Sequence, residues 1–335
     1  MAEEKELQQQ QIDLLEEFGY EDWETAGSAV QPGETMTFVV DTPCKRLDGF
    51  LAEVCQDISR SRLQKLVKDG LVTVNQKTAK PSQNLETGDQ VLLFVPQPQE
   101  IKVEAEPIPL DVIYEDEDVI VINKPRGMVV HPAPGNYNGT LVNALLAHCK
   151  DLSGINGELR PGIVHRIDKE TSGLIVAAKH DKAHQGLVEQ WQTREVKRYY
   201  IALVHGNIGE PGGTIDAPIG RHPKDRKKMA VVPATGRHAV THSTVLERFG
   251  KYTLIQAKLD TGRTHQIRVH MSYLQHPVVG DIIYGPKGKA APQTGQFLHS
   301  AKMEFRQPIT NQTIQCEAPL PDDFAAFVER LRKER

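Results

Sequence analysis

The chain has 335 residues, 39% of them hydrophobic, which is enough for about two domains with real cores at a prior of roughly 150 residues each. Its longest aliphatic run, residues 174–178, is far shorter than the roughly 20 residues that cross a bilayer. The acidic start does not resemble a signal peptide, and four widely spaced cysteines exclude a disulfide scaffold. We therefore expect a soluble protein of the reducing cytoplasm.

The formal net charge of −4 hides a very uneven distribution. Residues 1–35 carry −9, so the remaining 300 residues carry +5. A second acidic stretch, residues 100–118, carries −7 and leaves a further positive surplus on the rest of the chain. This surplus suits a polyanionic partner. Taken alone, the first 35 residues are more typical of a solvated, disordered head.

After this head, the sequence predicts two short amphipathic helices, with apolar residues at helical spacing from Leu47 to Val54 and again from Leu63 to Val67. Ser59 and Ser61 are candidate N-caps of the second helix, and Gly70 ends it. Short strands are expected around Val72 and at residues 91–95. The second helix carries four bases: Arg60, Arg62, Lys65 and Lys68. On charge alone, an RNA-binding face and an ordinary solvated face are equally reasonable.

The pattern RLDGFLAEVCQDISRSRLQKLVKDGLVTVN resembles the S4 domain, a small RNA-binding module, and this likeness runs over residues 45 to about 96. The resemblance implies that the basic helix contacts the RNA backbone. We therefore divide the chain into an acidic head (1–35), an S4 domain (36–96), a proline-rich linker (97–109) and a catalytic domain (110–335). The prolines of the linker disfavour a helix and favour an extended chain.

The last of these regions predicts strands at residues 119–122, 173–178, 199–204, 241–247 and 253–259. Helices are predicted at residues 140–149, 181–193, 265–274 and 322–332. Strands and helices do not alternate regularly, so we expect an α+β domain with a mixed, largely antiparallel sheet rather than a doubly wound sheet.

Several common motifs are incomplete. The stretch GDIIYGPKG, residues 280–288, has Pro286 where a P-loop has its lysine and lacks the Ser or Thr that follows. No HExxH occurs, and His180 with His184 lacks a third ligand set by spacing. The sequence thus indicates neither a metal site nor a nucleotide site.

Two polar segments remain as candidates for chemistry. In PGIVHRIDKETSGLIVAAK, residues 161–179, Asp168 lies in a polar turn directly before a buried strand, where a carboxylate can be held rigidly and partly desolvated. On this motif alone, an aspartate that merely caps the turn is the more probable interpretation.

The second segment is LDTGRTHQIRVHMSYLQHPVVGDIIYG, residues 259–285. If residues 265–274 are helical, Ile267, Met271 and Leu274 face the core, and Arg268 lies beside that face, partly buried. A buried arginine requires a carboxylate, and we predict that Arg268 binds Asp168 and keeps it ionised. The plain alternative is two unrelated surface charges.

Together with NKPRGMVVHP and QFLHSAKMEF, the segments HRIDKETSG and TGRTHQIRVH resemble the signature segments of the RluA-type pseudouridine synthases. The similarity covers nearly all of residues 110–320 and is strongest to the large-subunit ribosomal RNA pseudouridine synthase D type. It implies Asp168 as the catalytic aspartate, Arg268 as its partner and Tyr200, rather than the adjacent Tyr199, against the uracil. Leu298 would line the pocket, Arg166 would fill the gap left by a flipped nucleotide, and His165 would join the substrate-binding residues.

The resemblance implies isomerisation of uridine to pseudouridine with no cofactor and no metal. Its implied target is the helix 69 stem-loop of bacterial large-subunit (23S) ribosomal RNA, free or in an assembling large subunit. We expect a monomer with no membrane partner. Candidate RNA-backbone contacts are the four bases of the S4 helix together with Arg221, Lys227 and Lys228.

Two other functions stay open at this point. A non-catalytic RNA-binding factor for ribosome assembly would use the same S4 module, but it would not require Asp168, Arg268 and Tyr200 together. An aspartate-dependent hydrolase of small molecules would share the carboxylate, but it would leave the S4 module unexplained.

Overall fold

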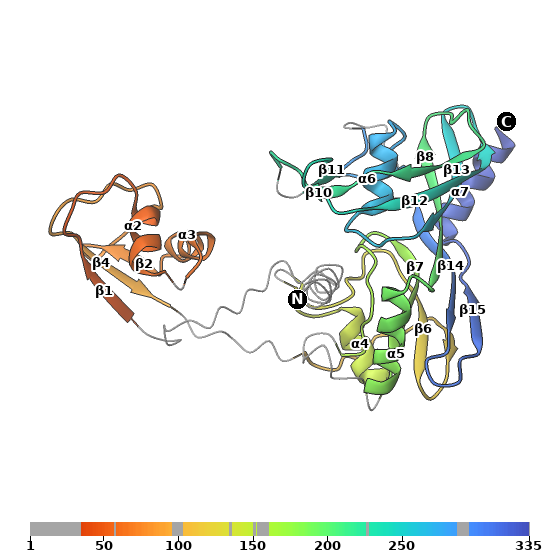
Figure 1. The fold of residues 1–335 in the computed structure, drawn as a ribbon, viewed down its shortest axis with the longest axis horizontal. Coiled ribbons are helices and arrows are strands. Elements are labelled where there is room, and N and C mark those ends of the chain that lie inside the picture. The colour runs from red at the N-terminus through yellow and green to blue at the C-terminus, as the bar shows by residue number, and fades with distance from the viewer. Residues whose placement is uncertain are drawn as a thin grey trace, which may run out of the picture. The chain divides into compact units, whose positions relative to one another are not determined.

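The computed structural model describes residues 35–56, 58–95, 103–133, 136–149, 152, 161–225, 228–286 and 295–334. These residues form two compact units, one of residues 35–95 and one of residues 103–334 (Figure 1). The predicted disordered head lies outside the described residues, except for Thr35, which begins the first strand.

The first unit packs two helices on a four-stranded antiparallel sheet of order β1-β4-β2-β3. The elements are β1 (Thr35–Val39), α2 (Leu47–Val54), α3 (Arg60–Lys68), β2 (Val72–Val74), β3 (Lys77–Thr78) and β4 (Gln90–Phe94). Ser59 is the N-cap of α3, because its side chain accepts a hydrogen bond from the Arg62 backbone amide, whereas Ser61 lies inside the helix. Both predicted helices are confirmed.

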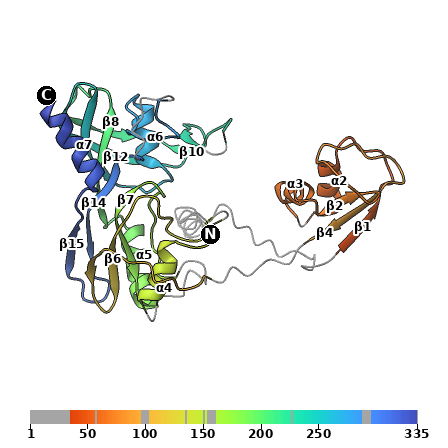
Figure 2. The same cartoon turned by 180° about the vertical axis from the view of Figure 1, so that it is seen from behind.

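The second unit is built on a nine-stranded sheet of order β5-β6-β7-β14-β8-β13-β12-β9, with β15 paired to β14. Its strands are β5 (Val112–Glu115), β6 (Val119–Lys124), β7 (Ser172–Ala178), β8 (Lys197–His205), β9 (Gly212–Asp216), β12 (Val240–Arg248), β13 (Tyr252–Leu259), β14 (Leu298–Arg306) and β15 (Thr313–Glu317). A separate hairpin joins β10 (Ile219–Arg221) to β11 (Met229–Val231). Figure 2 shows the sheet from behind, with β15 beside β14.

Only the contact between β7 and β14 is parallel among the strand pairs of this sheet, which confirms the expected mixed, largely antiparallel architecture. The parallel contact is short and very close. A side chain on Gly173, whose φ is +107°, would overlap the backbone of Ser300. Glycine is therefore required at this position.

The four helices of this unit are α4 (Leu141–His148), α5 (Asp181–Gln192), α6 (Gln266–Tyr273) and α7 (Asp322–Lys333). All four were predicted, as were five of the strands, with ends that differ by a few residues. The prediction for Leu274 is wrong: it caps α6 and is 42% exposed, whereas Ile267 and Met271 are buried. Leu274 is exposed because it is the first residue beyond the helix, so it no longer follows the helical spacing that buries Ile267 and Met271.

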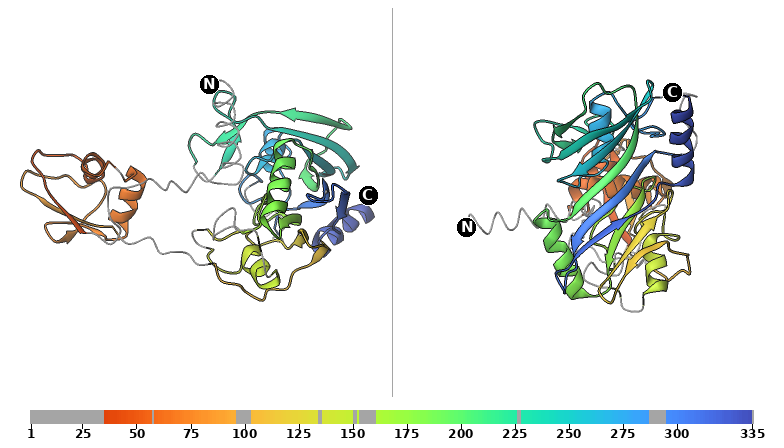
Figure 3. Two further views of the ribbon diagram at one scale, coloured as in Figure 1. Left: turned by 60° about the horizontal axis from the view of Figure 1, so that its bottom comes forward. Right: turned by 90° about the vertical axis from the view of Figure 1, so that its right-hand side faces the viewer.

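Alternate side chains of β6 and β7 enter two different apolar clusters, as the period of two of a strand requires. Ile120 and Ile175 pack with α4 and α6, whereas Val121 and Val176 pack with α5. The C-terminal helix α7, dark blue in Figure 3, packs on β8 and β13 through Phe324 and Val328. Burial on both faces of β7 makes it a rigid support for the loop that precedes it.

Residues 103–109, which fall in the predicted linker, are attached to the second unit. The Asn143 side chain of α4 donates to the Glu104 carbonyl oxygen at 2.8 Å, and the Glu106 amide donates to the Asn143 carbonyl oxygen at 2.9 Å. Within the described ranges, no helix combines the length and the apolar character needed to span a lipid bilayer.

Candidate active site

The loop of residues 161–171 places Asp168 just before the buried strand β7. Ile163 forms a bridge with Ala177 of β7, so the loop runs beside the strand that follows it. The Thr171 amide donates to the Asp168 carbonyl oxygen at 3.0 Å and closes a tight turn. The backbone of Asp168 therefore shapes the turn, which leaves its side chain available for another role.

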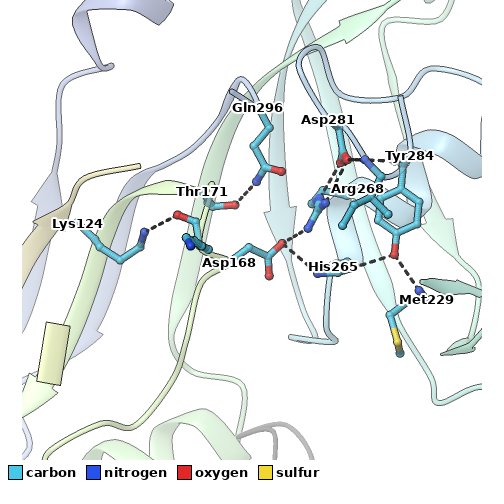
Figure 4. A network of polar contacts seen from close by, with 11 residues as sticks. Lys124, Asp168, Thr171, Met229, His265, Arg268, Asp281, Tyr284 and Gln296 are labelled. Carbon is cyan, nitrogen blue, oxygen red and sulfur yellow. Dashed lines mark hydrogen bonds and ion pairs between the residues drawn. The ribbon is translucent and has the colours of Figure 1, made fainter. Parts of the chain in front are cut away.

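That side chain meets Arg268 of α6, as the sequence predicts. Arg268 Nη1 donates to Asp168 Oδ2 at 2.8 Å, and the two side chains are 5% and 21% exposed, respectively (Figure 4). Asp168 Oδ1 accepts no hydrogen bond from any residue that the structure describes. One oxygen of the carboxylate is thus anchored, and the other is open to a substrate.

Arg268 is held from its other side by Asp281, which the sequence analysis did not single out. Arg268 Nε and Nη2 donate to Asp281 Oδ2 and Oδ1 at 2.6 and 3.1 Å, and the Asp281 side chain is fully buried. The amides of Ile283 and Tyr284 also donate to Asp281 Oδ1. The arginine therefore bridges two carboxylates, and its orientation is fixed by the buried one.

Two glycines set the position of Asp281. Gly280 has a φ of +79°, and a side chain there would overlap the carbonyl of Gly295, so the chain before and after this segment is in backbone contact. The incomplete P-loop motif at residues 280–288 thus has a different use. Its aspartate clamps Arg268, and its glycine allows the close approach.

His265 approaches the same oxygen of Asp168 as Arg268 does, with Nε2 4.0 Å from Asp168 Oδ2. It is the N-cap of α6 and has a left-handed backbone, φ 58°, which is uncommon outside glycine and often marks functional sites. The hydroxyl of Tyr284 accepts from the Met229 amide and lies 2.9 Å from His265 Nδ1. Burial lowers the pKa of His265, and the neighbouring charge of Asp168 opposes this shift.

Lys124, at the end of β6, holds the loop that carries Asp168 through hydrogen bonds to backbone carbonyl groups. Its fully buried ammonium donates to the carbonyl oxygens of Pro125, Met128 and Lys169 at 2.9, 2.9 and 3.2 Å. Burial lowers the pKa of Lys124 to about 7. This lysine was also missed by the sequence analysis, and it joins two turns that are 45 residues apart in the chain.

The predicted catalytic and substrate-binding residues share one cavity that is open to solvent on one side. The cavity is lined by His165, Arg166, Asp168, Tyr200, Arg268 and Leu298, together with Trp191, Arg198, Arg263 and His265. Tyr200 and Leu298 are buried in its wall. Tyr199 does not line it, so the placement favours Tyr200 of the two adjacent tyrosines.

Asp168 is ionised in this setting. Burial on its own would raise the pKa of the carboxyl, but the charges of His265, Arg268 and Arg166 and the hydrogen bond from Arg268 outweigh it and hold the pKa below its usual value. Burial also raises the pKa of Tyr200, so its hydroxyl stays protonated at pH 7. The cavity therefore presents one anionic oxygen beside a neutral aromatic face, an arrangement suited to nucleophilic or base chemistry on a flat ring.

The predicted RNA-backbone contacts lie outside this cavity. Arg60, Arg62, Lys65 and Lys68 are exposed on α3, although Arg60 also binds the buried Asp48 at 3.2 Å. Arg221 is exposed at the end of β10, and Lys228 is partly buried beside β11. Lys227 lies outside the described residues.

Comparisons with known proteins identify the family of the chain. The RNA pseudouridylate synthase family model matches residues 118–273, and the S4 domain model matches residues 45–91. The solved structure of human RNA pseudouridylate synthase domain containing 1 matches with a TM-score of 0.53 and 25% identity, over 70% of this chain and 97% of that one.

Among curated relatives, the uncharacterized RNA pseudouridine synthase YlyB of Bacillus subtilis is 55% identical over 86% of this chain and 95% of its own. Ribosomal large subunit pseudouridine synthase D of Neisseria meningitidis serogroup A is 48% identical over 86% of this chain and 79% of its own. At this identity and coverage, and with an S4 domain in front of the catalytic unit, the chain belongs to the RNA pseudouridine synthases.

Proposed function

We propose that this enzyme converts uridines of bacterial large-subunit ribosomal RNA to pseudouridine, within the helix 69 stem-loop, and that Asp168 is its catalytic group. The target is supported by the similarity to relatives named ribosomal large subunit pseudouridine synthase D. The observation that carries the role of Asp168 is its asymmetric carboxylate in the cavity wall, with Oδ2 held by Arg268 and Oδ1 without a partner among the described residues.

The reaction breaks the bond between uracil N1 and ribose C1′ and forms a bond between C5 and C1′. The C5 proton is released and N1 takes up a proton, so no atoms are gained or lost overall. An ionised Asp168 fits attack on C1′, attack on C6 of the base or removal of the C2′ proton. The target base must leave its stack at a cost of a few kcal/mol, which is lowest in a loop, and the face of Tyr200 offers it a new stacking partner.

In this proposal, Arg166 occupies the gap left by the flipped nucleotide, and Leu298 and His165 contact the substrate. The exposed bases of α3, with Arg221, Lys227 and Lys228, contact the RNA backbone. The enzyme acts in the cytoplasm as a monomer, on free RNA or on an assembling large subunit. Replacing Lys65 and Lys68 by Gln should weaken RNA binding in all sequences and reduce its salt dependence by about one unit of slope for each contact.

The test is tritium release from large-subunit ribosomal RNA labelled at uridine C5, followed by mapping of the product. Wild-type enzyme should release tritium, and Asp168→Asn, which keeps the size of the side chain, should be slower by about 10³-fold or more while still binding RNA. Asp111→Asn is a matched control, because that exposed aspartate only binds Asn123.

Product at sites outside helix 69 would contradict the target but not the catalytic role. Release by Asp168→Asn at the wild-type rate would contradict the role of Asp168. No release from either RNA or immature particles would contradict both and would favour an RNA-binding assembly factor.

A further inference from the structure

One wall of the catalytic cavity holds three buried nitrogen groups that no described residue satisfies. They are His165 Nδ1, Trp191 Nε1 and Arg198 Nε, in side chains that are 5%, 7% and 7% exposed. All three residues line the same cavity as Asp168. Buried polar groups in proteins are almost always hydrogen-bonded, so three orphans side by side indicate a missing partner.

Arg198 is the most unusual of the three, because its charge is uncompensated. It lies on β8 two residues before Tyr200, so both side chains project from the same face of the strand. No carboxylate of the described residues is within ion-pair distance, and its nearest aromatic contact is the Trp191 ring, 5.9 Å from the guanidinium carbon. A buried charge without a counter-ion destabilises the free protein and therefore calls for a functional reason.

His165, which lines the cavity, has a donor on its ring that is free of partners among the described residues. Its Nε2 accepts a hydrogen bond from the Val176 amide at 3.0 Å, so that nitrogen carries no proton. Burial lowers the pKa of His165 to about 3, which keeps the ring neutral and places its single proton on Nδ1. The ring stacks on Trp191 with 4.6 Å between centroids, so the two side chains pack directly against each other. The wall is thus a set of donors beside a positive charge.

The reacting base has the complementary chemistry. Uracil carries two carbonyl oxygens, and when the N1–C1′ bond breaks, the electron pair stays with the base and its charge spreads over N1, O2 and O4. Donors fixed in a water-poor site where charge develops are a major source of catalysis. A phosphate group, in contrast, would be expected nearer the exposed Arg166 than beside side chains that are more than nine-tenths buried.

We propose that Arg198, His165 and Trp191 form a subsite that binds the carbonyl oxygens of the flipped uracil and stabilises its anion after the N1–C1′ bond breaks. This inference rests on the proposed catalytic role of Asp168 in the same cavity, and it adds the groups that stabilise the electron pair left on the base. As the C5–C1′ bond forms, the charge returns to the ring, N1 takes up a proton and the C5 proton is released.

The first test compares Arg198→Met with wild type in single-turnover pseudouridine formation and in RNA binding. We expect the rate at saturating RNA to fall about 10²–10³-fold, as when an oxyanion donor is removed elsewhere, with the Kd for RNA changed less than about threefold. The melting temperature should rise or stay constant, because an uncompensated charge is removed. Lys197→Met is the matched control, since that neighbouring cation binds Glu304 and is half exposed.

A second variant, Trp191→Phe, keeps an aromatic side chain but removes the indole N–H together with its five-membered ring, so it should slow the reaction without unfolding the protein. The substrate side is tested with stem-loops in which the mapped target is 2-thiouridine or 4-thiouridine, because sulfur is a weaker acceptor than oxygen. Wild type should discriminate against at least one of them, and Arg198→Met should lose most of that discrimination.

A wild-type rate in Arg198→Met, or thio discrimination that the variant retains, would overturn the subsite. Weaker RNA binding with a normal rate at saturation would overturn it as well and would assign Arg198 to a phosphate. A lower melting temperature with intact thio discrimination would indicate a purely structural arginine. If wild type itself forms no pseudouridine, the failure lies in the proposed function rather than in this subsite.

Discussion

Each unit of the molecule contains an aspartate bound by arginine, and the two pairs have opposite burial. In the S4 unit, the Asp48 side chain is fully buried, and its partners Arg46 and Arg60 are half exposed. In the catalytic unit, Arg268 is buried and Asp168 is the more exposed partner. The member that reaches the surface is an arginine in the unit expected to bind RNA backbone, and a carboxylate in the unit that performs chemistry.

The hydrogen bonds differ in the same way. Arg46 donates to both oxygens of Asp48 at 2.9 Å, and Arg60 and Gln64 add two further bonds. Asp168 instead has one bonded oxygen. A carboxylate whose lone pairs are all occupied fixes a fold, whereas one that is held by a single oxygen is oriented and still reactive. An arginine bound to an aspartate is therefore not by itself a sign of a catalytic site.

Removing the buried clamp should have the largest effect. Asp281→Asn leaves the buried Arg268 with only Asp168 as a counter-ion, so we expect a loss of about 3–5 kcal/mol in the free energy of unfolding and a severe loss of activity. Urea denaturation and tritium release measure the two effects. Asp111→Asn again serves as a control that should alter neither. A change of less than about 1 kcal/mol would show that Asp281 does not hold the arginine.

The corresponding change in the S4 unit should be smaller and confined to that unit. Asp48→Asn removes a buried charge whose arginine partners can be solvated, so we expect a loss of about 1–3 kcal/mol, local to α2 and α3. Amide hydrogen exchange of the intact chain can locate it. The rate at saturating RNA should stay at the wild-type value, and a large fall in that rate would erase the proposed contrast between the two aspartates.

The smallest expected effect is the pH dependence of the stability that Asp48 contributes to the S4 unit. The hydrogen bonds from Arg46 hold the pKa of Asp48 well below its usual value, so its contribution to stability is present above about pH 4 and is lost as the pH falls further. Protection of α2 and α3 in wild type should then approach that of Asp48→Asn below about pH 4. A gap between them that is constant from pH 7 to pH 3 would contradict this reasoning.

The sequence predicted much of the candidate active site, because its parts have local patterns. Asp168 precedes an apolar run that could only be a buried strand, and the apolar spacing around Arg268 indicated a helix with a partly buried arginine. The expected strands and helices around them were found for the same reason. The pairing of Asp168 with Arg268, 100 residues apart, could be predicted because a buried arginine requires a carboxylate.

The same requirement also indicates a second acceptor for Arg268, which the structure shows to be Asp281. A guanidinium has five N–H groups, and one carboxylate oxygen cannot satisfy them, so a second acceptor was required. Lys124 and Arg198 gave no such signal, since a lone base in a strand is usually exposed, and only the tertiary packing shows them to be buried. Strands such as β9 and β15 were not predicted, because they are short and their apolar residues alternate only weakly.

The contact between Gly280 and Gly295 also bears on how the chain can tolerate changes in length. The chain leaves this contact just before Asp281 and returns to it after residue 294, so the ends of an insertion point are held together by the fold itself. Doubling a loop closed in this way costs only about 0.6 kcal/mol. The clamp on Arg268 therefore begins at a backbone contact that a longer connection between residues 286 and 295 need not disturb.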